Sequence, residues 1–407
     1  MRKILLFTIL LFVGKVAYAE EYTDFGTGIV YTLNPQQYTA MVKSGDVITW
    51  DKDYEYTAGS PEAKGKVAIL DKITVGSKSY TVTKIGDYAF VKQTNLTGIS
   101  IPETVVTIGK EAFADCISLE SVVMSKGLKE ISQEAFRGCT SLKTVALPSG
   151  LEIIGFASFC NCQKLESITI PESVGDVHVT SFEGCDALCS IVVEKGNAVY
   201  DSRENCNAII ETKSNTLLHG CKNSTIPSSV TEIGVRAFRG CRGLEQMDVP
   251  ESVEIIGEQA FLDCKELKSV VLHDGLKAVG LYAFGNCALS ELTIPASVED
   301  LGTNALWMLG LQSITSLIEN PQTMEDFCNS ESSNTILYVP SGAKARYEAT
   351  YPWNKFQEII EIDTNGLHLV RGLQDAVNSS YDLQGRRLAQ PPTKGIYVKN
   401  GRVIIVK

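Results

Sequence analysis

One nine-residue phrase recurs along the middle of the chain and constrains the fold more than any other feature. The phrase reads I-G-x-x-A-F-x-x-C, and its phenylalanines recur every 23 residues apart from one gap of 56. A fixed period of about 20 to 29 residues is typical of a solenoid, in which each unit buries its apolar side only by stacking on the next. Such an array offers a long surface rather than a central pocket. The phenylalanines are Phe90, Phe113, Phe136, Phe159, Phe182, Phe238, Phe261 and Phe284.

Each unit divides into two halves, which predict two walls of a coil. The half L-x-x-I-x-I-P, as in Leu165–Pro171, alternates apolar and polar residues and indicates a half-buried strand. Its proline follows the strand, where a missing N–H breaks no ladder bond. The half that contains A-F suits one helical or 3₁₀ turn on the opposite wall. Stacked units therefore predict an α/β solenoid with a parallel sheet on its concave face and the phenylalanines in a column inside the coil.

The alternation along each strand also predicts which side chains face solvent. Leu142, Val145 and Leu147 should point inward, and Thr144 and Ala146 outward. Most outward residues are small and uncharged, which either eases crowding on a concave sheet or suits extended contact with a protein or glycan. We call these positions the ladder face. Its candidate ligand-contact residues are Ser121, Val123, Thr144, Ala146, Ser167, Thr169, Gln246, Asp248, Ser269, Val271, Glu291 and Thr293; Gly98, Ser100, Ser190 and Val192 share the face.

Seven cysteines form a second column, each three residues after a phenylalanine. Exported proteins usually oxidise their thiols, and coils stacked about 4.8 Å apart lie within disulfide range. Equivalent side chains in a stack point the same way, however, so a bridge would be strained. We expect buried thiols weakly hydrogen-bonded to loop backbone, because a linear column also lacks the tetrahedral arrangement of a zinc site. These cysteines are Cys116, Cys139, Cys162, Cys185, Cys241, Cys264 and Cys287.

The gap of 56 residues marks an irregular insertion, about residues 194–227. It contains Cys206 and Cys221, 15 residues apart and outside the column, within segments that predict a β-hairpin-like unit. The two cysteines form either a disulfide or two more packed thiols. His178 stands in the unit before the insertion, where other units carry I-G, and indicates a local irregularity rather than a site.

The two ends of the chain differ from the repeats. Residues 1–19 have a basic start, an apolar run and small residues before Glu20, which predicts a signal peptide. Residues 20–81 carry strand-like runs and predict a β-rich N-terminal cap, followed by the solenoid over residues 82–318. Residues 319–362 predict a C-terminal cap with a last strand at Leu337–Pro340, a short helix, and Trp353 and Phe356 covering the open edge. Residues 363–407 predict a small β module with a hairpin turning at Asn400-Gly401.

Charge and motifs argue against several functions. The formal net charge of −11 becomes −14 when the three basic residues of the predicted signal are removed, and no basic cluster suggests a nucleic-acid partner. After signal removal, no apolar stretch is long enough for membrane insertion. None of the four histidines lies in a metal-ligand spacing, and no nucleophile or phosphate-binding motif occurs. We expect no enzyme activity, cofactor or metal.

The repeat unit resembles the BspA-type leucine-rich repeat of bacterial surface proteins, over about Val82 to Leu317. The resemblance implies a curved solenoid, export, and binding of a protein or host surface, including extracellular matrix. The segments Tyr381–Arg386 and Lys394–Val398 resemble the C-terminal sorting tail of type IX secretion substrates, which implies sorting to or anchoring at the outer surface; periplasmic and secreted forms stay open. The function expected is a non-catalytic surface adhesin that binds a protein or glycoprotein through its concave face. The alternative is a structural envelope scaffold with no specific ligand.

Overall fold

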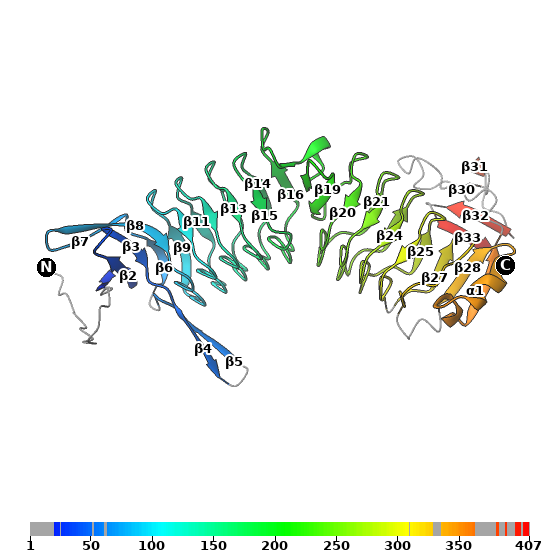
Figure 1. Cartoon of the computed structure of the whole chain (residues 1–407), viewed down its shortest axis with the longest axis horizontal. Coiled ribbons are helices and arrows are strands. Elements are labelled where there is room, and N and C mark those ends of the chain that lie inside the picture. The colour runs from blue at the N-terminus through cyan, green and yellow to red at the C-terminus, as the bar shows by residue number, and fades with distance from the viewer. Residues whose placement is uncertain are drawn as a thin grey trace.

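The protein is an arched array of stacked coils. The computed structural model describes residues 20–24, 26–50, 53–60, 63–308, 310–328, 335–362, 380–381, 387–388, 395–399 and 402–406. The predicted signal peptide lies outside these residues. Figure 1 shows the coils side by side along one long axis, with the N-terminal strands at one end and the C-terminal elements at the other. The predicted solenoid is confirmed.

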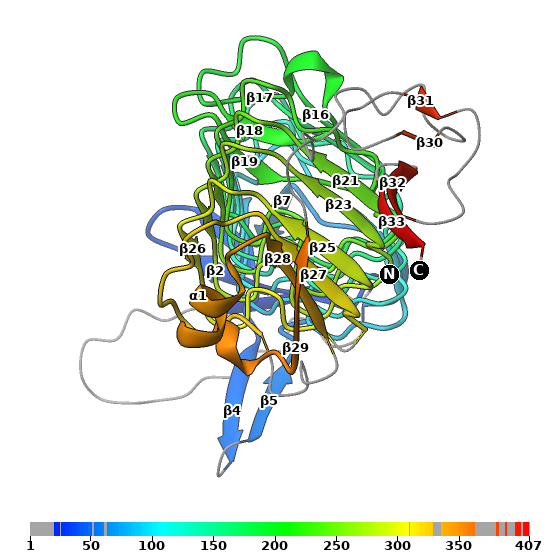
Figure 2. The ribbon, with the colours of Figure 1, turned by 90° about the vertical axis from the view of Figure 1, so that its right-hand side faces the viewer.

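One wall of the coils is made of parallel strands formed by the L-x-x-I-x-I segments. Where neighbouring strands pair they do so in register at the repeat spacing, so Ser167 lies beside Ser190 and Gln246 beside Ser269. Among the described strands the pairing is interrupted between β16 and β21 and between β23 and β25. The coil that lies between β11 and β14 contributes a single parallel bridge, from Thr144 to Ser167 of β14. Figure 2 shows this wall and the second wall from the end of the array. The strands are β9 (Leu96–Ser100), β11 (Ser121–Val123), β14 (Ser167–Ile170), β16 (Ser190–Val193), β21 (Gln246–Val249), β23 (Ser269–Leu272), β25 (Glu291–Ile294) and β27 (Ser313–Ser316).

The second wall consists of very short parallel strands that continue directly into turns. The A-F segments form these turns, in place of the expected helical or 3₁₀ turn. Residues two before the phenylalanine adopt left-handed backbone, as Glu111 (φ 49°) and Gln259 (φ 57°) do. The strands are β8 (Lys78–Ile85), β10 (Thr107–Ile108), β12 (Glu130–Ile131), β13 (Ile153–Ile154), β15 (Asp176–Val177), β20 (Glu232–Ile233), β22 (Ile255–Ile256), β24 (Ala278–Val279) and β26 (Asp300–Leu301).

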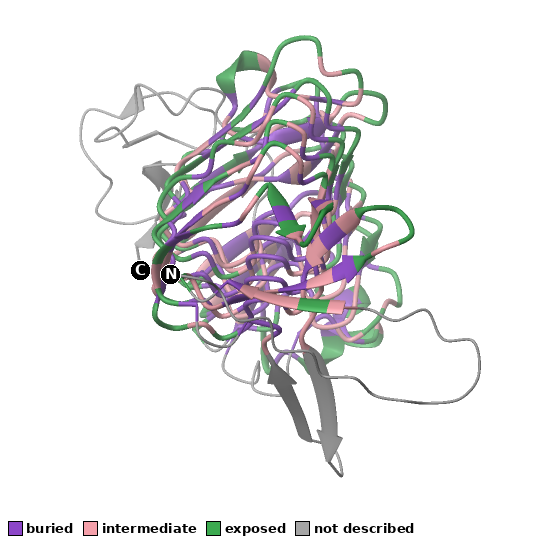
Figure 3. Ribbon diagram, turned by 90° about the vertical axis from the view of Figure 1, so that its left-hand side faces the viewer, coloured by how far each residue is buried: buried purple, intermediate pink, exposed green. Residues whose placement is uncertain are grey.

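The phenylalanines stack inside the coils as the repeat predicts. Phe90 and Phe113 have ring centroids 5.0 Å apart with nearly parallel planes, and Phe238 and Phe261 repeat this geometry. Stacked aromatic pairs at this distance each contribute about 0.5–1.5 kcal/mol beyond their buried area. Figure 3 shows buried residues lining the interior of the coil and exposed ones on the outside. The column and the two walls together hold one coil on the next.

The N-terminal residues form a β-rich cap that extends the second wall. β1, β2, β3 and β8 belong to one sheet with the short strands of the solenoid, and β7 pairs with β8. Another strand, β6, lies beside β9 in the first wall. Among the described strands, β4 and β5 pair with each other alone and project from the array as a hairpin (Figures 1 and 2). The strands are β1 (Glu20–Asp24), β2 (Ile29–Asn34), β3 (Thr39–Val42), β4 (Asp46–Trp50), β5 (Asp53–Thr57), β6 (Gly65–Ala68) and β7 (Lys72–Val75).

The insertion forms one irregular coil. β17 (Tyr200–Asp201), the 3₁₀ turn η1 (Arg203–Asn205), β18 (Ile209–Glu211) and β19 (Thr216–His219) occupy it. β18 and β19 are antiparallel, as the hairpin-like pattern predicts, and β19 then pairs in parallel with β20 of the next repeat. The insertion therefore starts a second sheet, which continues to β26.

The C-terminal cap closes the array. β28 (Ile336–Pro340) is followed by α1 (Lys344–Ala349), the 3₁₀ turn η3 (Trp353–Lys355) and β29 (Glu358–Ile362). The last strand of the first wall is therefore β29, one later than the sequence suggests, because it pairs in parallel with β28. Trp353 and Phe356 are buried.

The last residues form a separate small sheet. β30 (Ser380–Tyr381), β31 (Arg387–Leu388), β32 (Gly395–Lys399) and β33 (Arg402–Val406) pair with one another and with no strand of the solenoid. β32 and β33 are antiparallel across the predicted Asn-Gly position. The Asn-Gly pair itself, at residues 400–401, lies outside the described residues.

Candidate binding surface

The ladder face is a continuous row of outward side chains on the first wall. Where its strands pair, outward residues of neighbouring coils are register partners, as Thr169 and Val192 or Thr293 and Thr315 are. Alternation buries the residues between them, including Ile168 and Leu292. The backbone ladder fixes these positions before any ligand arrives, so little ordering cost remains on binding.

The structure exposes, fully or partly, every residue that the sequence proposes for ligand contact. Ser121, Thr144, Ala146, Ser167 and Thr169 are exposed in the N-terminal half. In the C-terminal half Gln246 and Asp248 are exposed, and Ser269, Val271, Glu291 and Thr293 are half-buried. Two apolar side chains stand out, since Val123 is 61% exposed and Val192 is 44% exposed. Gly98 is instead buried between Lys66 and Ser121.

The two halves of the ladder face differ in charge. Among the named positions, the N-terminal half carries hydroxyl, methyl and valine side chains, whereas the C-terminal half adds Asp248 and Glu291. His273 Nε2 lies 2.8 Å from Asp248 Oδ1. This hydrogen bond raises the pKa of His273, against the opposing effect of its burial. A ligand that follows the whole face would therefore meet a neutral section and then an acidic one.

The cysteine column consists of buried thiols that bind backbone. Six of the seven donate a hydrogen bond to the carbonyl of the phenylalanine one coil earlier, at sulfur–oxygen distances of 3.0–3.2 Å, as from Cys139 to Phe113 and from Cys264 to Phe238. Burial raises the pKa of the Cys139 thiol well above its ordinary value. The expected buried, hydrogen-bonded thiol is what the structure shows. The exception is Cys241, which has no such bond in the described part of the chain.

Cys206 and Cys221 are free thiols in this structure. Each is buried and lies near a different carbonyl, with Cys206 Sγ 3.9 Å from the oxygen of Ala208 and Cys221 Sγ 3.5 Å from that of Asn207. Of the two arrangements that the sequence left open, the structure therefore has packed thiols. No group of three or more metal-ligating side chains occurs among the described residues.

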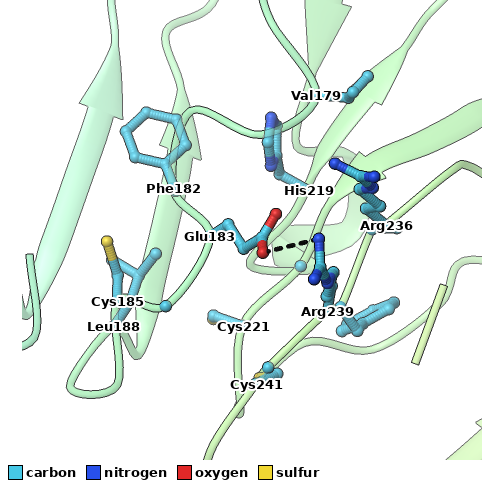
Figure 4. A pocket seen from close by; sticks show the side chains of 15 residues that line it. Val179, Phe182, Glu183, Cys185, Leu188, His219, Cys221, Arg236, Arg239 and Cys241 are labelled. Atoms are coloured by element: carbon cyan, nitrogen blue, oxygen red, sulfur yellow. Dashed lines mark ion pairs between the residues drawn. The ribbon is translucent and has the colours of Figure 1, made fainter. Parts of the chain in front are cut away.

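Sequence reasoning missed a structured break between the two halves of the solenoid, which we call the junction. On one side of this interface lies the coil of residues 174–193. On the other side lie the inserted coil, residues 199–221, and the turn of residues 236–241. A cavity of about 20 Å³ lies there, lined by Phe182, His219, Gly220 and Phe238 among others. This volume suits a water molecule rather than a substrate. Figure 4 shows Glu183 and Arg239 paired across it, 3.1 Å apart. Nothing in the repeat pattern points to this place, since the insertion interrupts the alignment.

The described helices include none that is both long and apolar enough to cross a membrane. Several of the described charged groups form ion pairs on the surface or at the turns. Arg137, for example, binds Glu134 at 2.7 Å and Asp115 at 3.1 Å, and it also reaches the buried Glu111. Such a network holds adjacent turns together.

Comparison with known structures shows the same fold in other bacterial proteins. The pneumococcal vaccine antigen PcpA is 23% identical with a TM-score of 0.61, and the match covers 86% of this chain and 100% of that one. A leucine-rich repeat protein from Bacteroides ovatus is 23% identical with a TM-score of 0.52, covering 82% and 75%. One from Eubacterium ventriosum is 21% identical with a TM-score of 0.52, covering 83% of each chain. No curated protein matches this chain in sequence.

The family model for the BspA-type leucine-rich repeat region matches residues 83–210 and 204–312 in six copies. These residues make up more than half of the chain and cover the regular coils together with the inserted coil. The period of 23, the buried phenylalanine column and the in-register first wall all lie within them. The chain therefore belongs to the BspA-type leucine-rich repeat family.

Proposed function

We propose that this protein is an exported, non-catalytic surface protein that binds a protein or glycoprotein through the ladder face. The observation that carries the proposal is the in-register row of outward side chains, small and largely uncharged, on a rigid parallel sheet. Its members make a long shallow surface that suits extended contact with another chain. The membership in a repeat family of bacterial surface proteins supports the same reading.

The proposed ligand is a protein or glycoprotein of a host or matrix surface. The neutral N-terminal half offers hydroxyl groups and the exposed valines Val123 and Val192, which favour shape and hydrogen-bond recognition over charge. Affinity of each contact would be modest, and display of many copies on one surface would raise the overall avidity. Such binding should depend only weakly on salt.

The test is a binding titration of the chain from Glu20 onward against immobilised matrix proteins and mucin glycans at physiological salt. Thr144→Lys and Thr169→Lys each place a long charged side chain in the middle of the ladder face and should abolish saturable binding. Thr107→Lys is the matched control, because Thr107 points outward from the second wall. It should leave binding unchanged.

Two results would count against this function. If all three lysine variants weaken binding equally, the ladder face is not the contact surface. If no ligand in the panel binds the unaltered chain and the protein stays with the cell envelope, the alternative of a structural scaffold replaces the adhesin.

A further inference from the structure

The junction differs from every regular coil contact in how the backbone is connected. Between regular coils, backbone hydrogen bonds cross on the second wall and at the turns, as from Gly257 to Ile233 and from Phe113 to Ala135. On the first wall the pairing is interrupted between some regular coils as well, such as those of β23 and β25. In the described chain no backbone-to-backbone hydrogen bond joins residues 174–193 to residues 199–221. The sheets of both walls end there. The boundary between the two hydrophobic clusters runs through the inserted coil instead: Tyr200, Ile209 and Cys221 pack in the N-terminal cluster, whereas Ile210 and Leu217 belong to the C-terminal one. Apart from the connecting chain, side chains alone hold the halves together.

Three hydrogen bonds from side chains bridge this interface. The Tyr200 hydroxyl accepts from the N–H of Val177 at 3.1 Å, and the Ser202 hydroxyl accepts from the N–H of Val193 at 2.9 Å. The third is made by His219, whose Nε2 lies 2.9 Å from the carbonyl oxygen of His178. A carbonyl only accepts, so Nε2 carries a proton. The ring is neutral near pH 7 because burial lowers the pKa of His219 to about 4. Two ion pairs, Glu183–Arg239 and Asp186–Arg242, add to these bonds at the rim.

His219 stands where the phenylalanine column is interrupted. Its ring meets Phe182 edge-on with centroids 5.4 Å apart, and only 4% of the residue is exposed. The next residue, Gly220, lies against the ring of Phe238, since a Cβ there would be 2.0 Å from a Phe238 ring carbon. His219 and Gly220 together therefore fill the space of one missing phenylalanine. Figure 4 shows the histidine beside Phe182 above the ion pair.

The charged and titratable groups around His219 do little to stabilise a second proton on its ring. His178 on the preceding turn and Arg236 and Arg239 on the following turn are all basic side chains. Glu183 is the one carboxylate lining the cavity, and Arg239 already binds it. The remaining titratable groups are the thiols of Cys185, Cys221 and Cys241.

We propose that the junction is an acid-sensitive hinge, at which protonation of His219 separates the two halves of the solenoid. A second proton would place a buried positive charge against Phe182 with no free carboxylate to bind it. Opening the junction would hydrate the ring. Because no backbone ladder crosses the interface, this separation needs no strand to be broken. Separation would expose Tyr200, Ile209 and Cys221, which pack on the N-terminal cluster, and leave the remainder of each cluster buried.

The expected pH range follows from the imidazole pKa. The pKa of His219 is lowered from 6.5 to about 4, mainly by burial and to a lesser extent by the nearby His178, against the opposing effect of the bond to the His178 carbonyl. The open state, with the ring in water, binds the proton more tightly than the closed state. Closure is therefore most stable above pH 6.5 and weakens as the pH falls towards 4. Between neutral pH and about pH 5, opening should be favoured by about 30-fold.

Hydrogen exchange of the full chain tests the hinge, with rates corrected for the intrinsic effect of pH. Protection of residues 179–185 and 219–225 should fall by about 30-fold at about pH 5, whereas residues 108–136 should stay protected. His219→Gln keeps a neutral donor and should hold the junction closed at both pH values. His273→Gln is the control, because His273 lies outside the junction; it should lose protection at acid pH as the unaltered chain does.

Two further measurements keep the test decisive if His219→Gln folds poorly. His219→Leu removes the titrating group by a different side chain and should likewise abolish the pH response. The imidazole of His219 can be titrated directly by NMR in the unaltered chain, which has only four histidines. A pKa near 6.5 in the closed protein, acid-induced loss of protection spread over both halves, or an equal response in the glutamine variant would each overturn the proposal.

Discussion

At the scale of single residues, the cysteines show how a chain can carry many thiols without bridging them. Every column thiol points in the same direction, and six of them donate to a carbonyl one coil away. Burial removes the thiolate, which is the reactive form. A column thiol therefore acts as a small packing group with a weak donor, and its environment opposes both oxidation and metal binding.

Thiol reactivity in the native protein should follow this arrangement. Burial raises the pKa of Cys139 well above its ordinary value and that of Cys160 to about 11. At mildly alkaline pH, maleimide should label the half-exposed Cys189 first, Cys160 slowly, and Cys139 only after unfolding. Mass spectrometry of peptides reports the order, and labelling in urea should reach all 12 cysteines. Rapid native labelling of Cys139 would contradict the buried column.

The repeated glycines allow close stacking of the second wall. A Cβ at Gly257 would lie 2.8 Å from the backbone of Gly234 in the preceding coil. We therefore expect Gly257→Ala to lower the free energy of unfolding by about 1–3 kcal/mol, the usual cost of overpacking. Gly175→Ala is the matched control, since no atom lies within 4 Å of its added Cβ. Urea denaturation of both variants tests this, and equal losses would show that contact between coils is not the cause.

At the scale of elements, the strands follow from the sequence more closely than the turns do. Ile168 and Ile170 alternate with polar residues, so the pattern alone fixes a strand and its inward side. The turns before each phenylalanine use left-handed residues such as Glu111, Gln259 and Tyr282, which carry none of the usual glycine or asparagine signal. Backbone bonds to the next coil hold them, as from Glu111 to Gln133. Those contacts exist only in the stack, so a single unit cannot reveal them.

The contacts at the junction could not be predicted from the repeat pattern either. The sequence marks the insertion and the odd His178, but it does not align His219 with the phenylalanines, because 33 extra residues separate the two registers. Only the fold brings His219 against Phe182. By contrast, the ladder face could be located in advance, since strand alternation and period decide which residues point outward.

The C-terminal cap should be stabilised by one tryptophan. Trp353 is fully buried, with its ring centroid 4.7 Å from that of Phe327 and 5.1 Å from that of Tyr347. Trp353→Ala should therefore cost about 3–5 kcal/mol, concentrated in the last coils, where hydrogen exchange would accelerate. Trp307→Ala, at a site 36% exposed, should cost much less. Faster exchange at Phe113 as well would mean that the cap stabilises the whole array.

At the scale of the whole molecule, the two hydrophobic clusters predict two units of unfolding. One cluster extends from Ile29 into the insertion, where it includes Tyr200, Ile209 and Cys221, and the other extends from Cys206 to Ile359. In repeat proteins stability is close to a sum over units and their contacts, so a weak contact divides the array. Exchange measured in increasing urea should give one midpoint for residues 90–159 and another for residues 238–284. Coincident midpoints would show that the junction transmits cooperativity.

The side-chain-only contact at the junction also has a mechanical meaning. A surface protein held at one end and bound to a ligand at the other is stretched along its length. In the regular coils that tension is shared among backbone hydrogen bonds of the second wall and the turns, whereas at the junction it falls on side chains, among them Tyr200, Ser202, His219 and two ion pairs. The first extension under force should therefore lengthen the chain near residues 193–200 and leave both sets of coils wound. The array would extend at the junction before the coils on either side unfold.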